Sequence, residues 1–183
     1  MTMLAAPLRR LRDSHGYTLV EMLTVLLILS VVMTGLTALL VQGSNAEAHM
    51  QNRFRAQLDA RLALDKLRRE IHCASTATPT GASSSLTITL PSYCKTGSGS
   101  ITWCTQSLGT NRYGLYRVVG TSCSGGVKWA DYLTSSSIFN FTAQTTSSLA
   151  YVHVDLPVNV NPRTSVDAYD LADDIVLRNS SRS

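Results

Sequence analysis

The sequence predicts an α+β protein, in which a long N-terminal helix with a transmembrane first half packs on an antiparallel β-sheet domain. Between Met22 and Ala46 there is no Asp, Glu, Lys or Arg, whereas residues 47–71 hold six basic and four acidic side chains. Beyond Ala74, apolar residues alternate with Ser and Thr. Only 15% of the 183 residues are charged, against about 25% in a typical soluble domain, which argues against a cytosolic enzyme. The apolar content, 44%, excludes a fully disordered chain.

The first element is the apolar run over residues 17–42. At about 1.5 Å per residue, a helix of this length crosses a hydrocarbon layer of about 30 Å. Residues 1–16 form a short basic head, and the positive-inside rule places this head in the cytoplasm and everything after Gln42 outside. Two alternatives remain open, a plain anchor and a secretory signal peptide cut near Ala46-Glu47-Ala48. The apolar run exceeds the roughly 7–15 residues of a signal peptide core, which disfavours the second.

Glu21 is a lone carboxylate near the start of this apolar run, where burial costs several kcal/mol unless a partner is found. The residues around it, Gly16-Tyr17-Thr18-Leu19-Val20-Glu21-Met22-Leu23, follow a basic head and precede about 20 apolar residues. This arrangement resembles the class III signal of type IV pilins and pseudopilins. The resemblance rests on a Gly, an aromatic first residue, a Glu in fifth place after the cut and a long apolar continuation.

The resemblance implies a processing and assembly scheme. A prepilin peptidase would remove a leader of residues 1–16 by cutting between Gly16 and Tyr17, and would methylate the new amine of Tyr17. Residues 17–42 would form the membrane-spanning and filament-core helix, surrounded by lipid before assembly. Glu21 would then pair with the N-terminal amine of a neighbouring subunit and set the axial register.

Residues 43–73 are expected to be the amphipathic half of the same helix. Gly43-Ser44-Asn45 weakens the helix without ending it. Apolar residues then recur every four or five positions among charged ones, and we expect them to form the face that a sheet covers: Met50, Phe54, Leu58, Leu62, Leu67 and Ile71.

Residues 74–183 are expected to form the antiparallel β domain, which is the layout that the pilin resemblance also implies. Ser and Thr make up 34 of these 110 residues. Runs rich in β-forming residues predict strands at 86–90, 100–104, 114–119, 138–141 and 151–156, with a final edge strand near 174–178. Loops at 95–100, 108–112 and 121–126 predict consecutive hairpins.

The four cysteines, Cys73, Cys94, Cys104 and Cys123, lie on the side predicted to be outside the membrane, where disulfides persist. Two bridges are the simplest account, and the sequence does not choose among three pairings. We favour Cys73 with Cys94, which would tie the helix end to the first hairpin, and Cys104 with Cys123, which would clamp the next one. The spacings match no zinc motif.

Neither a catalytic site nor a cofactor is expected, because the histidines show no arrangement with Ser, Cys or Asp that suggests a nucleophile. The acidic residues Asp167, Asp170, Asp173 and Asp174 could be calcium ligands, but they lack the twelve-residue loop signature. A solvated acidic loop is the interpretation that we favour.

A second resemblance concerns the system in which the chain works. Four short sequence segments resemble those of minor pilins of the J or W type: 101–103, 114–117, 129–133 and 174–179. We therefore expect a minor subunit that acts in filament initiation or at the tip, with prepilin peptidase, other pilins and the inner-membrane assembly platform as partners. A J-type pseudopilin of type II secretion is an alternative.

A competence pseudopilin that binds DNA is another alternative. It would use basic and aromatic side chains, for which the candidates are Lys95, Arg112, Arg117, Lys128, Trp103 and Trp129. Residues 74–183 carry seven basic and six acidic side chains, so the domain is close to neutral. That balance gives little support to DNA binding.

Overall fold

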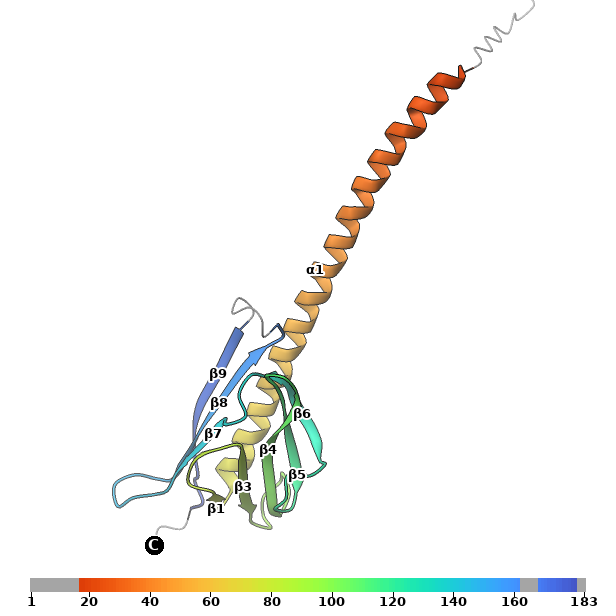
Figure 1. Cartoon of the computed structure of the whole chain (residues 1–183). Coiled ribbons are helices and arrows are strands. Elements are labelled where there is room, and N and C mark those ends of the chain that lie inside the picture. Colours follow the sequence, from red (N-terminus) through yellow and green to blue (C-terminus); the bar gives the residue numbers. More distant parts are fainter. Residues whose placement is uncertain (1–16, 162–167, 181–183) are drawn as a thin grey trace, which may run out of the picture. The chain divides into compact units, whose positions relative to one another are not determined.

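The computed structural model describes residues 17–161 and 168–180. It contains one long helix, α1 (Leu19–Cys73), followed by nine antiparallel strands (Figure 1). The α+β class expected from the sequence is therefore confirmed. The chain divides into two compact units, Met1–Glu47 and Ala48–Ser183, which are treated separately below.

The first unit contains the apolar part of α1. Every described residue up to Glu47 is exposed, including large side chains such as Leu26, which is 61% exposed, and Val31, which is 66% exposed. Among the described residues, α1 is the one helix long and apolar enough to cross a membrane, with a mean hydropathy of 2.5 in its most apolar window. So much exposed apolar surface needs lipid or other helices to cover it.

In the second unit, the last turns of α1 lie against the sheet (Figure 1). The predicted apolar face is wrong over its first half: Met50 is 74% exposed, Phe54 60% and Leu62 59%. The buried positions are instead Ala56, Ala60, Ala63, Leu64, Leu67, Glu70 and Ile71. At 100° per residue, a spacing of four drifts about 40° per step, so the predicted run winds around the helix. Alanines mark the covered face because they let the helix backbone approach the sheet closely.

The strands are β1 (Thr76–Thr78), β2 (Gly81–Ser83), β3 (Ser85–Leu90), β4 (Gly99–Gly109), β5 (Arg112–Val119), β6 (Val127–Leu133), β7 (Phe139–Thr142), β8 (Tyr151–Asn159) and β9 (Ala168–Val176). The strand predictions locate β3, β4, β5, β7 and β8, and miss the short β1 and β2. They also miss β6 as a strand, and they place the last strand too late in the sequence.

The strands form one curled sheet with the order β1-β3-β4-β5-β6-β8-β7-β2, to which β9 is joined through β8. From β3 to β6 the strands are consecutive neighbours, as the hairpin prediction requires. Beyond the three predicted hairpins the strand order departs from the sequence order, because β8 pairs with β6 at Leu133–Val158 and with β7 over four residue pairs. β1 and β2 are the first and the last strand in this order, yet they follow each other in the sequence. The short connection between them therefore brings the two ends of the strand order close together.

The core lies between α1 and the inner face of the sheet. Trp103, Phe139, Leu156 and Ile175 are almost completely buried there, together with Leu67 from the helix. Near the end of the chain, the Asn179 side chain donates a hydrogen bond of 3.0 Å to the Cys73 carbonyl, and Leu177 N–H donates one of 2.9 Å to Ala150. These bonds fix the C-terminal segment to the end of α1.

Candidate assembly site

The start of α1 is built as a capped helix end. The Glu21 N–H donates to Thr18 Oγ1 at 3.3 Å, so the Thr18 hydroxyl satisfies one of the orphan donors of the first turn. The sequence Thr18-Leu19-Val20-Glu21 has the S/T-x-x-E spacing of a capping box. A carboxylate in the first turn also interacts favourably with the helix dipole. The sequence reasoning missed this cap, in which Thr18 is the capping side chain and Glu21 contributes its backbone N–H.

The Glu21 side chain itself is exposed, as is Tyr17 immediately before the helix. Within the part of the chain that the structure describes, no cation forms an ion pair with the Glu21 carboxylate. Gly16, the other residue of the expected cleavage site, lies outside the described residues, as does the whole leader, 1–16. The carboxylate is thus available for a partner from outside the chain.

The polar side chains of the apolar helix satisfy themselves. Four hydroxyls donate to backbone carbonyls three or four residues earlier, at 2.7–2.9 Å: those of Thr24, Ser30, Thr34 and Thr37. In a hydrocarbon environment an unsatisfied hydroxyl costs several kcal/mol, so this pattern suits a helix surrounded by lipid or by other helices. Glu21 is the exception, because no group of the same helix neutralises its charge.

A second glutamate, Glu70, joins α1 to the sheet. It is completely buried and accepts hydrogen bonds from Arg117 Nε at 2.9 Å and from Trp103 Nε1 at 2.8 Å. Lys66 Nζ lies 3.1 Å from the same carboxylate. Every polar atom that faces this carboxylate is a donor, which is how a buried charge is tolerated. The sequence reasoning missed this network, although Glu70 shares the covered helix face with Leu67.

A charge cluster on β5 and β6 surrounds Asp131. Arg112 donates from Nε at 3.0 Å and from Nη2 at 2.9 Å, and Lys128 Nζ donates at 2.8 Å. Burial acts to raise the pKa of Asp131, but these bonds and the Tyr132 N–H outweigh it and lower the pKa to about 2. The same carboxylate raises the pKa of Arg112 and of Lys128. The Arg112 guanidinium also lies 4.1 Å from the centre of the Tyr132 ring.

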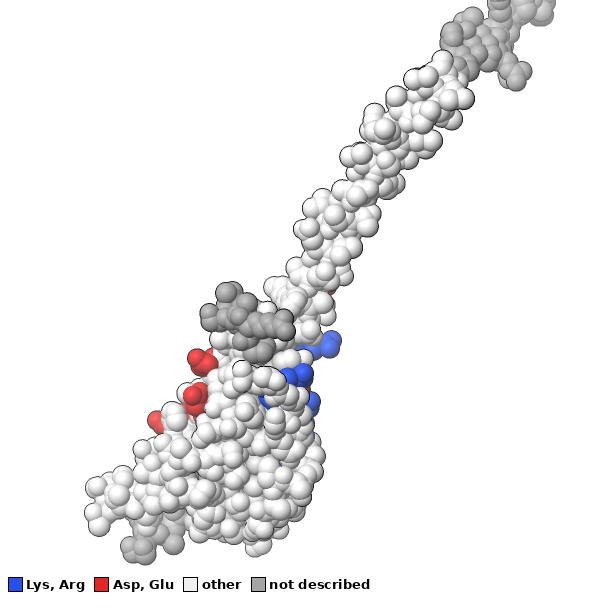
Figure 2. All heavy atoms as spheres, viewed as in Figure 1, with Lys and Arg blue, Asp and Glu red and all other residues white. Residues whose placement is uncertain are grey.

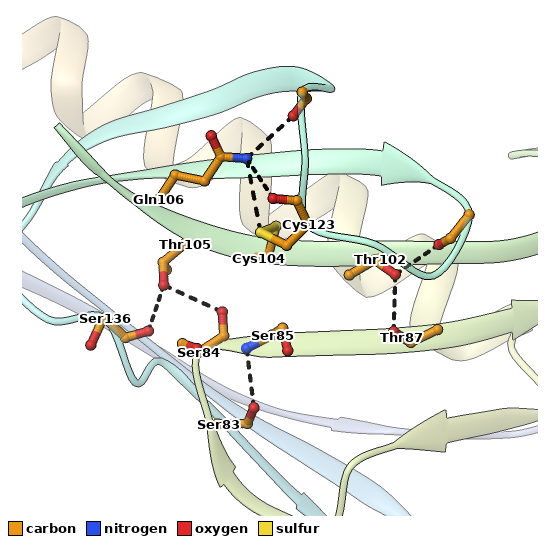
Figure 3. The surroundings of a disulfide bond; sticks show 12 residues. Ser83, Ser84, Ser85, Thr87, Thr102, Cys104, Thr105, Gln106, Cys123 and Ser136 are labelled. Atoms are coloured by element: carbon orange, nitrogen blue, oxygen red, sulfur yellow. Dashed lines mark hydrogen bonds between the residues drawn. A yellow bond between two sulfur atoms is a disulfide. The ribbon is translucent and has the colours of Figure 1, made fainter.

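The four cysteines form two disulfides, Cys73–Cys94 and Cys104–Cys123, which is the pairing favoured from the sequence. The second bridge holds the β5–β6 loop on β4 (Figure 3). Gln106 Nε2 donates to the carbonyls of Cys123 at 3.4 Å and Gly125 at 3.3 Å, and reinforces this attachment. The loop is therefore fixed both covalently and by hydrogen bonds.

Most of the DNA-binding candidates are already engaged within the domain. Trp103 is fully buried and Arg117 is paired with Glu70. Arg112 and Lys128 share Asp131. Of the six candidates, Lys95 is exposed and Trp129 is partly exposed, with its ring centroid 5.9 Å from that of Trp103. Lys128 and Trp129 line one groove beside α1, but Asp59 and Asp131 line it too and balance the charges of Arg55 and Lys128. These residues therefore do not form a strongly basic groove.

The acidic residues near the C-terminus lie on a strand, so their interpretation as a solvated loop is wrong. Asp170, Asp173 and Asp174 belong to β9, whereas Asp167 is outside the described residues. Alternation along the strand places Asp173 on the opposite face from Asp170 and Asp174. Asp173 pairs with Arg68 at 2.8 Å, and Asp174 pairs with His153 on β8 at 2.7 Å. Within residues 17–161 and 168–180, no group of three His, Cys, Asp or Glu is arranged to hold a metal ion.

Comparison with known families identifies the N-terminal segment. Residues 11–37 match the family model described as the prokaryotic N-terminal methylation motif, which confirms the resemblance seen around Gly16 to Leu23. No curated protein and no solved structure matches the chain. The match covers the signal and much of the exposed apolar part of α1, and it ends before the β domain begins.

Proposed function

We propose that this protein, which carries the N-terminal signal of the type IV pilin and pseudopilin superfamily, is a minor pilin or pseudopilin that acts in filament initiation or at the tip. The signal implies processing by a prepilin peptidase and assembly with other pilins, and it points to a structural subunit rather than an enzyme. The observation that carries the proposal is the combination of this signal with an apolar helix whose side chains are exposed throughout.

Processing would create the positively charged partner that Glu21 lacks within the described residues. Cleavage between Gly16 and Tyr17 would release a new α-amine, four residues before Glu21 in the mature chain. A neighbouring subunit would bring its methylated Tyr17 amine to the Glu21 carboxylate, and pairing would remove the penalty for burying that carboxylate among apolar helices. The capped start of α1 supports this scheme, because it leaves the carboxylate exposed in the first turn of the helix.

The domain would lie outside the inner membrane, with the leader in the cytoplasm, until the assembly platform moves the subunit into the filament. Two disulfides in a domain of modest size favour an oxidising compartment. The exposed helix and its internally bonded hydroxyls favour lipid around α1 before assembly. These features agree with a membrane-anchored precursor.

The role of a minor subunit is supported by the four short sequence segments that resemble minor pilins of the J or W type. A J-type pseudopilin of type II secretion would use the same signal, helix and domain. DNA capture is a weaker candidate, because Trp103, Arg117, Arg112 and Lys128 already have partners within the domain.

The proposal is tested first on the mature N-terminus. The chain is purified from cells with and without the prepilin peptidase, and its N-terminus is analysed by mass spectrometry. We expect N-methylated Tyr17 only where the peptidase is present. A mature chain that begins near His49 would instead identify a secretory signal peptide.

The role of Glu21 is tested by two substitutions that separate the charge of its side chain from the polarity. Glu21→Gln removes the charge and keeps a polar side chain, whereas Glu21→Ala removes both, and each variant keeps the backbone N–H that donates to Thr18. We expect both variants to be processed normally and to be lost from sheared filaments to the same extent. If Glu21→Gln enters filaments at the wild-type level, the charge of Glu21, and with it the ion pair, is not what assembly requires.

The role of a minor subunit is tested by measuring how abundant this chain is in filaments. Quantitative mass spectrometry of sheared filaments should find this chain at a small fraction of the major subunit, and deletion of its gene should reduce filament number. A chain that makes up most of the filament would be a major pilin instead.

A further inference from the structure

Strand β9 has a free edge. It pairs with β8 over all nine of its residues, without a register shift, and with no other described strand (Figure 1). Natural proteins usually protect such an edge with Pro, Lys, a bulge or a very short strand, because unpaired backbone groups can pair with another chain. β9 contains neither Pro nor Lys. Its length and regularity therefore suit the addition of a further strand.

The hydrogen bonds of β8 indicate which backbone groups of β9 face the free edge. The Asp155 N–H donates at 2.9 Å to the carbonyl of Ile138, just before β7. The Pro157 carbonyl accepts at 2.9 Å from the N–H of Thr134, just after β6. Odd-numbered residues of β8 thus bond on the β6–β7 side. Because successive residues of a strand point their backbone groups to opposite sides, the even-numbered residues of β8 bond to β9.

The register transfers this alternation to β9. Even-numbered residues of β8 lie opposite odd-numbered residues of β9, so the even-numbered residues of β9 direct their N–H and carbonyl groups away from β8. Val176, the last of them, accepts with its carbonyl from His72 Nδ1 at 2.8 Å, which agrees with this assignment. Within the described residues, no hydrogen bond occupies the outward backbone groups of Asp170, Ala172 and Asp174.

The solvent-facing side chains at this edge are acidic. Asp170 and Asp174 are exposed, and Asp155 of β8, opposite Ala172, is exposed on the same face. Figure 2 shows acidic side chains along this side of the domain. Among the described residues, no Lys or Arg forms an ion pair with these three carboxylates, and the partner of Asp174 is His153. An added strand would place its solvent-facing residues about 5 Å from those of β9, so Lys or Arg is favoured at these positions.

The opposite face of β9 offers apolar contacts beside α1. Tyr169 and Leu171 are partly buried on this face, and together with Leu64 of α1 they line a pocket of about 280 Å³. The alternate residues of an added strand would point toward this side, where apolar side chains fit. The other residues that line the pocket are Arg61, Asp65 and Arg68.

We propose that the free edge of β9 binds an extended segment of another protein, with Lys or Arg at every second position and apolar residues between them, which joins the sheet as a further strand. A second copy of β9 does not suit this edge. Full antiparallel overlap of two copies would set Asp170 of each directly opposite Asp174 of the other, and like charges in that position are destabilising. The edge belongs to the folded domain, so this binding goes beyond the proposed function and does not depend on it.

Strand addition is tested on the full chain in non-ionic detergent micelles, with a short synthetic peptide of alternating Lys and Val as the probe. Binding is followed by fluorescence anisotropy, and amide hydrogen exchange measured by NMR locates the contact. We expect binding to slow the exchange of the Asp170, Ala172 and Asp174 amides. Absence of binding, or binding without slower exchange at these amides, overturns the proposal. Amides that are protected before the peptide is added would show that this chain or a second copy already covers the edge, which also overturns it.

Two N-methylated versions of the peptide keep its charge and separate strand addition from charge attraction. One is methylated on the Lys amides and the other on the Val amides. An added strand turns only one of these sets toward β9, so one version should lose affinity about tenfold and the other should bind like the parent peptide. Equal affinity of all three peptides would refute strand addition. A peptide with Glu in place of Lys should bind about tenfold more weakly, and equal binding would show that the charge of the partner is assigned wrongly.

Ala172→Pro tests the same edge from the side of the protein. The Ala172 N–H points away from β8, so Pro removes an outward donor without breaking a bond to β8, and an edge strand tolerates Pro in that position. We expect the affinity for the peptide to fall about tenfold, with an unfolding midpoint close to that of the wild type. Ala172→Ser is the matched control, because it keeps the N–H, and it should bind like the wild type. Equal affinity of the Pro variant and the wild type overturns the proposal, and if that variant fails to fold, the methylated peptides decide.

Discussion

Replacement of Glu70 by Ala tests the network that fixes α1 to the sheet. The carboxylate is completely buried and accepts from Arg117 and Trp103, with Lys66 beside it. Ala would leave the Arg117 guanidinium, 17% exposed, and the Trp103 indole N–H without their acceptor. Lys66, at 19% exposed, can turn toward water more easily.

The size of the effect follows from these partners. Removing one member of a buried ion pair costs about 3–5 kcal/mol, because a buried charge is left uncompensated. The indole N–H alone contributes about 1–3 kcal/mol of that penalty. We therefore expect Glu70→Ala to lower the free energy of unfolding by about 4 kcal/mol. Glu70→Gln keeps an acceptor for the indole, and we expect it to cost roughly half as much.

The measurement is denaturant unfolding of the full chain in detergent micelles, followed by tryptophan fluorescence. The chain has two tryptophans, Trp103 and Trp129, and both lie in the sheet close to the network, so the signal reports directly on it. Asp59→Ala is the matched control, an exposed acidic residue on the same helix, and it should leave the midpoint unchanged.

A double substitution separates the ion pair from simple packing. Glu70→Met with Arg117→Met removes both charges and keeps apolar volume, so its cost should be clearly smaller than the sum of the two single changes. Additive costs, or a Glu70→Ala change below about 1 kcal/mol, would show that Glu70 is not the fixed point between helix and sheet.

Three further predictions concern the β4–β6 region and use the same unfolding assay. Gly126→Ala should cost about 3 kcal/mol, because φ is +89° and a Cβ would lie 2.6 Å from a backbone oxygen. Gly120→Ala, with φ +111° and open space, should cost only about 1 kcal/mol. The lowered pKa of Asp131, about 2, stabilises the fold by at most about 2 kcal/mol above roughly pH 4, and this is lost as the pH falls toward 2; Asp131→Asn should remove that part of the pH dependence. Cys104→Ser with Cys123→Ser should cost about 3 kcal/mol for a bridge that spans 19 residues, and an unchanged midpoint would contradict it.

The sequence was most informative where local chemistry decides the structure. The signal at Gly16 to Leu23 and the charge-free run after it need no tertiary context, and the family match covers the same residues. Strands β3 and β8 could be located because apolar residues alternate along them, as they do where one face of a sheet is buried.

It was least informative where distant elements decide. Residues 50–62 contain both an apolar run and an alanine run, and only contact with the sheet selects the alanines as the covered face. β2 is three residues long and pairs with β7, about 58 positions away, so nothing local marks it as a strand. Glu70 reads as an ordinary helix-surface charge until β4 and β5 bring Trp103 and Arg117 to it.

Two glutamates of α1, Glu21 and Glu70, need a cationic partner, and they differ in where that partner comes from. Glu70 is neutralised by Lys66 and Arg117 of the same chain, so its burial is complete when the domain folds. Glu21 has no cation within the described residues, yet it lies in an apolar helix that must be covered by lipid or by other helices. A carboxylate in that position is tolerated only if its partner arrives when the helix is covered. On this reasoning, loss of Glu70 should impair folding before assembly, whereas loss of the Glu21 charge should leave a folded, processed subunit that fails at assembly.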